Sequence, residues 1–267
     1  MKKAILTISK VIIFFIVWAV LSTVIDIPVE NLVIWRFIAE LIPLVVIIIL
    51  TWLFIRIEKQ KLRIPINDNS IRGLLMGIFV GILWVGFSAG LLILTNYLKI
   101  TEINNVPMLW IWIISAFINV IMQELLVRGY IYQLIKKEYN LPVAIVVTTV
   151  IFSLLHGGAI EAGIIPVLNV VTMCLFTTFL YEAEGTILAP TMSHAIWNII
   201  GGLILGGVRL ADDYPSLITM TPSKNQILSG GDCMIEGSVI VLITNIILML
   251  IFYKRYKNNT KKAWTSF

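Results

Sequence analysis

The hydrophobic pattern of the chain is a series of long apolar segments separated by short polar stretches. A run of about 18 or more apolar residues is long enough to cross the hydrocarbon core of a bilayer as a helix, and a spanning backbone must satisfy its own hydrogen bonds. The pattern therefore predicts an all-α polytopic membrane bundle with about eight transmembrane helices. The predicted segments are residues 5–25, 33–55, 73–98, 108–131, 142–158, 162–181, 187–207 and 238–253.

Composition supports the same fold class. Hydrophobic residues make up 59% of the 267 residues and charged residues only 13%, whereas a soluble domain carries roughly a quarter charged residues. We therefore expect one membrane domain over residues 1–267 and no separate soluble domain. Cys174 lies in an apolar segment and Cys233 in a polar loop, so a disulfide framework is not expected.

Basic residues predict the orientation. Fifteen of the 20 Lys and Arg residues lie in the terminal segments and alternate loops on one side of the spans. These stretches are residues 1–10, 56–72, 132–141, 182–186 and 254–267. The positive-inside rule then places both termini in the cytoplasm, in a multi-pass protein of the plasma membrane. Because the basic residues flank the apolar segments, the net charge of +5 needs no nucleic acid to explain it. We therefore expect the lipid bilayer, rather than nucleic acid, as a partner.

Polar side chains within the apolar segments gather on three of them. Ionisable groups at membrane depth are costly and usually functional. Glu124 and Arg128 are four residues apart, so they share a helix face and can form an ion pair. His194 and Asn198 have the same spacing. Together they could donate two hydrogen bonds to one oxygen, which is the arrangement that an oxyanion needs.

The second histidine, His156, follows Phe152 by four residues at the end of the fifth predicted segment. The aromatic ring could shield one side of the imidazole, and a protected imidazole with a nearby acid can activate a water molecule. Counted from Pro142, His156 falls nearer the outer half of the membrane, whereas His194, counted from Ile187, falls in the cytoplasmic half. The convergence of both histidines and one of the few acid–base pairs on three segments nevertheless favours a single site.

Each of these patterns also has a purely structural explanation. A Glu–Arg pair on one helix, a lone histidine or a His–Asn pair can simply hold helices together. Glu40 is the main competing acid, and it lies four residues from Arg36. We interpret Arg36 and Glu40 as an interfacial ion pair.

In their order along the chain, the motifs resemble those of the CAAX-protease and bacteriocin-processing (Abi) family, which includes the type II CAAX prenyl endopeptidases and bacterial proteins linked to self-immunity. Its members carry Glu-Glu-x-x-x-Arg, Phe-x-x-x-His and His-x-x-x-Asn/Asp on separate core helices. The resemblance covers residues of about 120 to 200, within a core region of about 108–207. The matching residues here are Gln123-Glu124-x-x-x-Arg128, Phe152-x-x-x-His156 and His194-x-x-x-Asn198.

The resemblance implies an intramembrane endopeptidase of the glutamic type, which hydrolyses a peptide bond in a membrane-associated peptide or protein with neither metal nor cofactor. In the family, the first Glu and the histidine of the second motif activate the water. The second Glu pairs with the Arg, so Arg128 is a supporting residue here. Phe152, in the second motif, is another supporting residue. The last His and Asn stabilise the oxyanion.

One residue departs from this pattern, because Gln123 stands where the family has its first Glu. An amide has no titratable carboxylate and cannot serve as a general base. Glu124 is a poor substitute, since neighbouring helical residues point about 100° apart and Arg128 stabilises its anion. Three explanations remain open, namely a variant that uses another base, a non-catalytic relative, or an inactivating substitution.

Three other functions remain as alternatives. A non-catalytic immunity or regulatory protein could use the same cavity to hold a peptide, and Gln123 favours it. A transporter or channel would also contain intramembrane charges, but the chain has no inverted repeat or paired broken helices. A catalytic zinc ion could be held by His156, His194 and Glu124, but the chain lacks a His-Glu-x-x-His motif, which argues against a zinc site.

Overall fold

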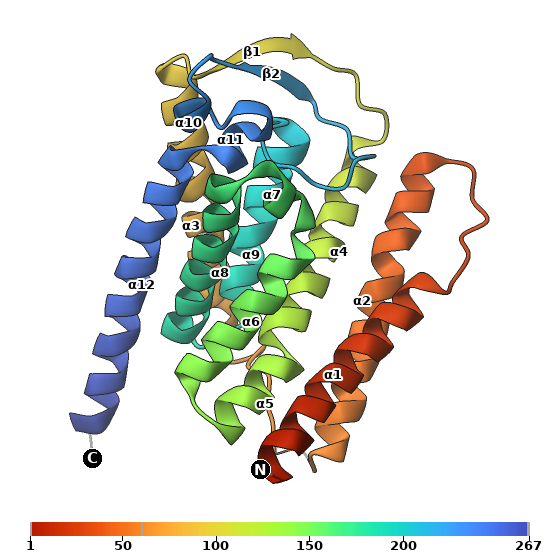
Figure 1. The fold of residues 1–267 in the computed structure, drawn as a ribbon, viewed down its shortest axis with the longest axis vertical. Coiled ribbons are helices and arrows are strands. Elements are labelled where there is room, and N and C mark those ends of the chain that lie inside the picture. The colour runs from red at the N-terminus through yellow and green to blue at the C-terminus, as the bar shows by residue number, and fades with distance from the viewer. Residues whose placement is uncertain (1, 60, 266–267) are drawn as a thin grey trace. The chain divides into compact units, whose positions relative to one another are not determined.

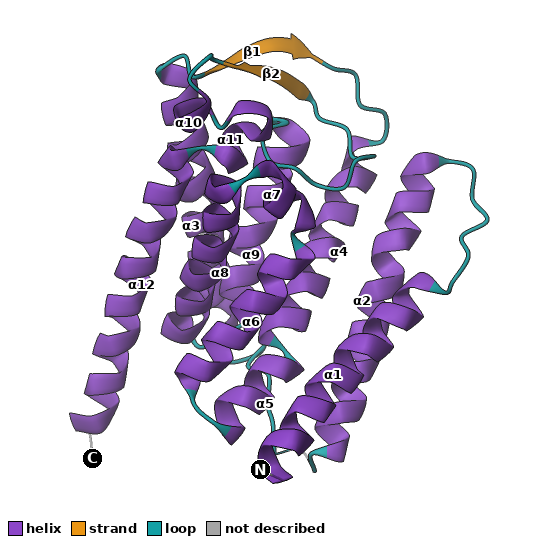
Figure 2. Ribbon diagram, in the orientation of Figure 1, coloured by secondary structure: helices purple, strands orange, loops and turns teal. Residues whose placement is uncertain are grey.

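The computed structural model describes residues 2–59 and 61–265, which fold into two compact units. Unit 1 consists of Met1–Ile64 and Met108–Thr148, and unit 2 of Pro65–Pro107 and Thr149–Phe267. Helices dominate both, as Figures 1 and 2 show, and the all-α fold class is confirmed. The expected single membrane domain stays a prediction.

Unit 1 is built around α2 (Leu32–Ile57), which packs against α1 (Lys2–Thr23) and α4 (Leu109–Arg128). Figure 1 shows α1 and α2, red and orange, side by side. The unit also contains α5 (Tyr130–Glu138) and the first residues of α6 (Leu141–Leu155). Most side chains of α1 and α2 are apolar, and many of them are exposed, as expected where lipid replaces water as the solvent.

Unit 2 contains two pairs of packed helices and a two-stranded sheet. The helix α8 (Ile164–Glu184) packs against α12 (Val239–Thr265), and α3 (Ser70–Leu94) packs against α9 (Leu188–Ile196). The strands β1 (Leu98–Ile103) and β2 (Ile218–Pro222) pair antiparallel with an irregularity between Ile100 and Glu102, at the upper end of the unit 2 helices in Figure 1. The remaining elements are α7 (Gly157–Ala162), the π-helix η1 (Trp197–Ile204), α10 (Gln226–Ser229), the 3-10 turn η2 (Gly231–Cys233) and α11 (Met234–Gly237).

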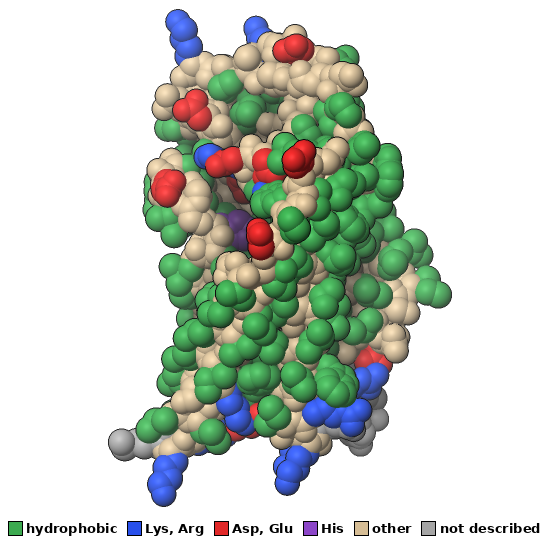
Figure 3. Space-filling view, turned by 90° about the vertical axis from the view of Figure 1, so that its right-hand side faces the viewer, with side chains coloured by type: hydrophobic (Ala, Val, Ile, Leu, Met, Phe, Trp, Pro, Cys, Tyr) green, Lys and Arg blue, Asp and Glu red, His purple; other side chains and the backbone are tan. Residues whose placement is uncertain are grey.

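Within the described part of the chain, six helices are long and apolar enough to cross a membrane. The predicted count of eight is not confirmed. The fifth predicted segment is the 15-residue α6, and the seventh is the 9-residue α9 followed by the 8-residue η1. Apolar side chains cover most of the face drawn in Figure 3. The six helices are Lys2–Thr23, Leu32–Ile57, Ser70–Leu94, Leu109–Glu138 (α4 with α5), Ile164–Glu184 and Val239–Lys261.

Polar contacts within unit 1 join three of the stretches that the charge pattern assigns to one side. Lys3 pairs with Glu138 at 3.2 Å, and Lys10 pairs with Glu58. Lys137 donates to the Lys61 carbonyl oxygen at 3.0 Å. These contacts place the N-terminal end of α1, the segment after α2 and the end of α5 at one end of unit 1.

The same grouping occurs independently in unit 2, where the buried Glu184 carboxylate pairs with Arg72 at 3.4 Å and with Arg255 at 2.7 Å. Asn259 donates to the Ala183 carbonyl oxygen at 2.9 Å. The start of α3, the end of α8 and the C-terminal part of α12 therefore meet at one end of unit 2, and the β1–β2 pair lies at its other end.

Candidate active site

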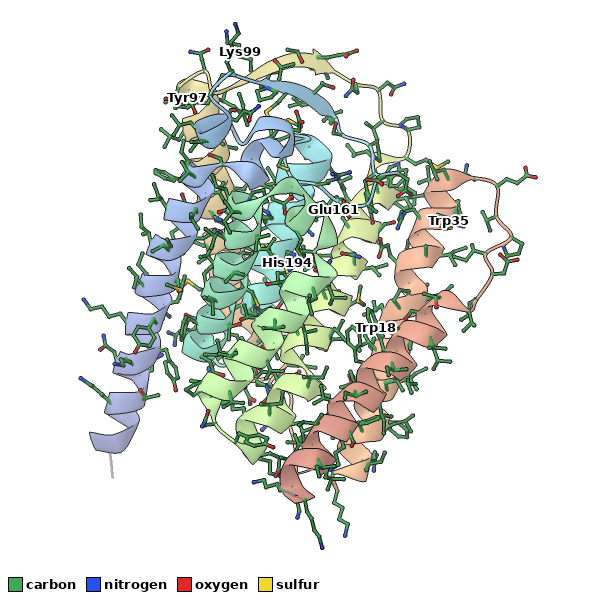
Figure 4. The ribbon with its side chains drawn as sticks, in the orientation of Figure 1. Trp18, Trp35, Tyr97, Lys99, Glu161 and His194 are labelled. Carbon is green, nitrogen blue, oxygen red and sulfur yellow. The ribbon has the colours of Figure 1, made fainter. Side chains whose placement is uncertain are left out.

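The unit 2 part of the candidate site is an aromatic cluster around Phe152. This side chain is buried near the end of α6. Its ring centroid lies 4.2 Å from that of His156 and 6.1 Å from that of His194. Both histidines of the chain therefore gather around the same ring. Figure 4 labels His194 among the helices of this unit.

His156 does not end a helix as the sequence suggested. The helix α6 ends at Leu155, and His156 is the N-cap residue of the short helix α7. Its Nδ1 lies 2.8 Å from the Phe152 carbonyl oxygen. A carbonyl oxygen only accepts hydrogen bonds, so Nδ1 carries the hydrogen, and Nε2 is left as an acceptor in the neutral ring.

His194 and Asn198 lie on either side of a change in helix type. His194 is in the last turn of α9 and is buried, and Asn198 is 6% exposed in the π-helix η1. The sequence predicted a regular helical i,i+4 relationship between them. Stretches of π-helix are rare and occur often at functional sites. The change of helix type therefore favours a functional role for His194 and Asn198, which the sequence analysis also proposed.

Two tryptophans, which sequence reasoning missed, fix the start of η1. Trp84 on α3 stacks on Trp197 with ring centroids 3.9 Å apart and planes at 13°, and its Nε1 donates to Asn245 Oδ1 at 2.8 Å. Trp197 is the residue immediately before Asn198, so this stacking holds the backbone that carries the predicted oxyanion donor.

Close contact between α3 and α9 depends on small residues. A Cβ atom at Gly77 would lie 2.3 Å from the Ala189 carbonyl oxygen, and one at Gly81 would lie 3.0 Å from that of Ser193. Small residues allow helix backbones to approach closely in membranes. The glycine spacing in α3 therefore sets the position of the helix that carries His194.

The unit 1 part of the candidate site lies at the end of α4. Glu124 and Arg128 are buried, and Arg128 Nη1 donates to Glu124 Oε2 at 2.5 Å. The predicted pair is therefore present. The helix breaks directly afterwards at Gly129, where a Cβ atom would lie 2.1 Å from the Leu125 carbonyl oxygen. Only glycine fits there, and the chain changes direction into α5.

Gln123 belongs to a hydrogen-bonded series that sequence reasoning also missed. Asn119 Nδ2 donates to Glu40 Oε2 at 2.7 Å, and Gln123 Nε2 donates to Asn119 Oδ1 at 2.5 Å. Arg36 pairs with Glu40 at 3.3 Å, as the sequence predicted. The spacing of Asn119 and Gln123 was a usable signal, because two amides at i and i+4 in an apolar helix share one face.

The predicted site residues thus fall into two groups. The structure brings Phe152, His156 and His194 together in unit 2, with Asn198 four residues after His194. Gln123 and the Glu124–Arg128 pair belong to unit 1. That both groups form one site stays a prediction. Among residues 2–59 and 61–265, no three His, Cys, Asp or Glu side chains are arranged to hold a metal ion.

Comparison with protein families identifies the segment that contains all of these motifs. Residues 105–200 match the family model described as type II CAAX prenyl endopeptidase Rce1-like. This match covers every residue predicted for the site from Gln123 to Asn198. No curated protein and no solved structure shows significant similarity to the chain.

Proposed function

We propose that this chain, whose residues 105–200 match the Rce1-like family model, is an intramembrane endopeptidase that cleaves a membrane-associated peptide or protein. The main support for this function is that both histidines lie around Phe152 inside the matched segment. Ionisable groups at membrane depth are costly and usually functional, and two imidazoles around one ring suit a site that binds a water molecule and a carbonyl group.

His156 is the residue that binds and deprotonates the water. Its Nδ1 contact with the Phe152 carbonyl oxygen fixes the ring orientation and leaves Nε2 as the acceptor. The water gives a proton to Nε2 as its oxygen attacks the scissile carbonyl carbon. The protonated ring can then donate that proton to the leaving nitrogen, which completes the hydrolysis.

His194 and Asn198 are the oxyanion donors in this proposal. Attack on a carbonyl carbon places negative charge on its oxygen, and fixed donors in a site that excludes water stabilise that charge. Burial of His194 and Asn198 and the tryptophan stack beside them favour such a fixed arrangement. The Glu124–Arg128 pair supports the site structurally.

Gln123 limits the rate, because it cannot share in removing the proton from water. This residue is also the observation that favours a second function. A chain that binds peptide in the same site without cleaving it would serve as an immunity or regulatory protein. The two functions differ in their product, which is a cleaved peptide in one case and a stable complex in the other.

The direct test is hydrolysis of a quenched fluorescent peptide by the purified full chain in detergent. The peptide is prepared in a farnesylated CAAX form and in an unprenylated form. In ¹⁸O-labelled water, hydrolysis of either form should place ¹⁸O in the new carboxylate of the product. His156→Ala should abolish the signal, Lys224→Ala should not change it, and a metal chelator should leave the rate unaltered. Binding without cleavage supports the immunity alternative, and loss of activity with the chelator contradicts the metal-free mechanism.

A further inference from the structure

A buried carboxylate lies at the start of the Gln123 hydrogen-bond series, on a helix outside the family segment. Glu40 on α2 is 5% exposed. Its Oε1 lies 3.3 Å from Arg36 Nη1, and its Oε2 accepts a hydrogen bond from Asn119 Nδ2 at 2.7 Å. Glu40 is therefore more than one half of an interfacial ion pair, because it also bonds to Asn119 on a second helix, which carries Gln123.

The charge of Glu40 determines which way each following amide is turned. An ionised carboxylate only accepts hydrogen bonds, so Asn119 must present its Nδ2 to Glu40. Asn119 Oδ1 then faces Gln123, so Gln123 must turn its donor, Nε2, toward that oxygen. Each amide has one donor end and one acceptor end. The orientation set at Glu40 is therefore transmitted to Gln123 through Asn119.

The acceptor end of Gln123 remains at the end of this series. Gln123 Oε1 is buried, and among the described residues it accepts no hydrogen bond. A buried acceptor without a donor costs free energy, so the oxygen is suited to a donor that arrives with a ligand.

We infer that Glu40 is a positioning residue that acts through Asn119 to hold Gln123 Oε1 as the acceptor for a ligand's hydrogen-bond donor. Two sources have this chemistry, namely the backbone N–H of an extended peptide and the O–H of a water molecule. The inference rests on the proposed function only for the identity of the ligand. The amide orientation is a property of the chain alone.

The orientation can be tested without any substrate. In the wild-type background, Gln123→Glu places a carboxylate against Asn119 Oδ1, where two acceptors repel each other. In the Glu40→Gln background, Asn119 is free to turn and offer Nδ2 to the new carboxylate. Gln123→Glu should therefore lower the Tm by about 2–4 °C in the first background and by much less in the second, a shift well within measurement for a domain of this size.

Two controls separate transmission through Asn119 from a general effect of charge. Glu102→Gln, which alters an exposed acid on β1, should leave the Tm effect of Gln123→Glu unchanged. Asn119→Ala should remove the coupling between positions 40 and 123. Equal Tm effects of Gln123→Glu in the wild-type and Glu40→Gln backgrounds would overturn the inference, whether or not the chain proves to be a peptidase.

A second experiment, with peptides, distinguishes a peptide N–H from a water O–H as the donor to Gln123 Oε1. A series of probe peptides, each with one backbone amide replaced by an ester, lacks one N–H at a time. If Gln123 Oε1 accepts a peptide N–H, one ester should raise the KM or Kd roughly tenfold in the wild type, as expected for one lost hydrogen bond of about 1.4 kcal/mol, and have little effect in Glu40→Gln. If no ester matters but Glu40→Gln lowers kcat at unchanged KM, the donor is water. No change in KM, kcat or Kd with Glu40→Gln, for any of these peptides, would refute the role in ligand binding.

Discussion

Burial separates two ion pairs that look alike in the sequence. Glu124 and Arg128 have side chains 1% and 0% exposed, whereas the Arg209 and Asp212 side chains are 63% and 88% exposed. Exposed pairs contribute roughly 0–1 kcal/mol. Removing one partner of a buried pair instead leaves an uncompensated charge in a low dielectric.

Arg128→Ala should therefore lower the free energy of unfolding by about 3–5 kcal/mol and reduce the yield of folded protein. Arg209→Ala is the matched control and should leave the stability within about 1 kcal/mol of wild type. Thermal unfolding of both variants in the same detergent measures the difference. Wild-type stability of Arg128→Ala would show that the pair does not hold the end of α4.

A second residue-scale effect concerns Glu236 on α11, in the segment that connects η1 to α12. Burial raises the pKa of this carboxyl to about 7 from its ordinary value of 4.5, although Arg209 opposes the shift through its backbone N–H and its charge. The folded chain therefore retains this proton to a higher pH than the unfolded chain, so stability should fall as the pH rises from about 4.5 to 7.

Glu236→Gln should flatten this part of the pH–stability profile and should make the chain more stable than wild type above pH 7. Unfolding temperatures measured across the range for wild type, Glu236→Gln and the exposed-acid control Glu102→Gln would check it. An unchanged slope in Glu236→Gln would mean that other groups cause the pH dependence.

At the scale of elements, the break between α4 and α5 depends on one glycine. The N–H of Gly129 donates to the Leu125 carbonyl oxygen at 2.9 Å, and a Cβ atom would lie 2.1 Å from that oxygen. Gly129→Ala should therefore destabilise the chain by about 1–3 kcal/mol.

Gly86→Ala is its matched control, because a Cβ atom there meets nothing within 4 Å on helix α3. It should be neutral or stabilising by up to about 1 kcal/mol. The comparison of unfolding temperatures separates the steric effect from helix propensity. Equal effects of the two substitutions would contradict a steric role for Gly129.

Sequence reasoning recovered elements where length and hydrophobicity determine them, and missed those that tertiary contacts determine. Long uniform runs such as Ser70–Leu94 were predictable from the bilayer requirement alone. The end of α6 before His156 and the π-helical stretch around Asn198 have no comparable signal, because they depend on contacts such as the stacking of Trp84 on Trp197. The β1–β2 pair joins residues more than 100 positions apart, which no local pattern encodes.

The candidate site shows the same division. Glu124, Arg128 and the two histidines could be found because charged or titratable groups are rare in apolar segments. Asn119 was overlooked although its spacing from Gln123 is visible in the sequence. The link to Glu40 could not be predicted, since it depends on how α2 packs against α4.

At the scale of the whole molecule, each unit independently groups loops that the charge pattern assigns to one side. The Lys3–Glu138 pair does so in unit 1, and the Arg72–Glu184–Arg255 contacts do so in unit 2. Within each unit this grouping agrees with the charge pattern, and the cytoplasmic location of both termini stays a prediction. In a background in which both native cysteines are changed to Ser (Cys174→Ser and Cys233→Ser), a Cys introduced by Lys224→Cys should be labelled by an impermeant maleimide from outside the cell, and one introduced by Lys61→Cys only after permeabilisation. Labelling of both from the same side would refute the topology.

In the proposed function, the chain is an intramembrane protease in which Gln123 replaces the carboxylate that would share in removing a proton from water. Peptidase activity of Gln123→Glu measures this most directly, because general-base assistance contributes about 10²–10⁴-fold in rate. We expect Gln123→Glu to raise kcat within that range over the wild-type chain, and we expect the addition of His156→Ala to remove the gain. Equal activity of Gln123→Glu and wild type, or a gain that survives His156→Ala, would contradict it.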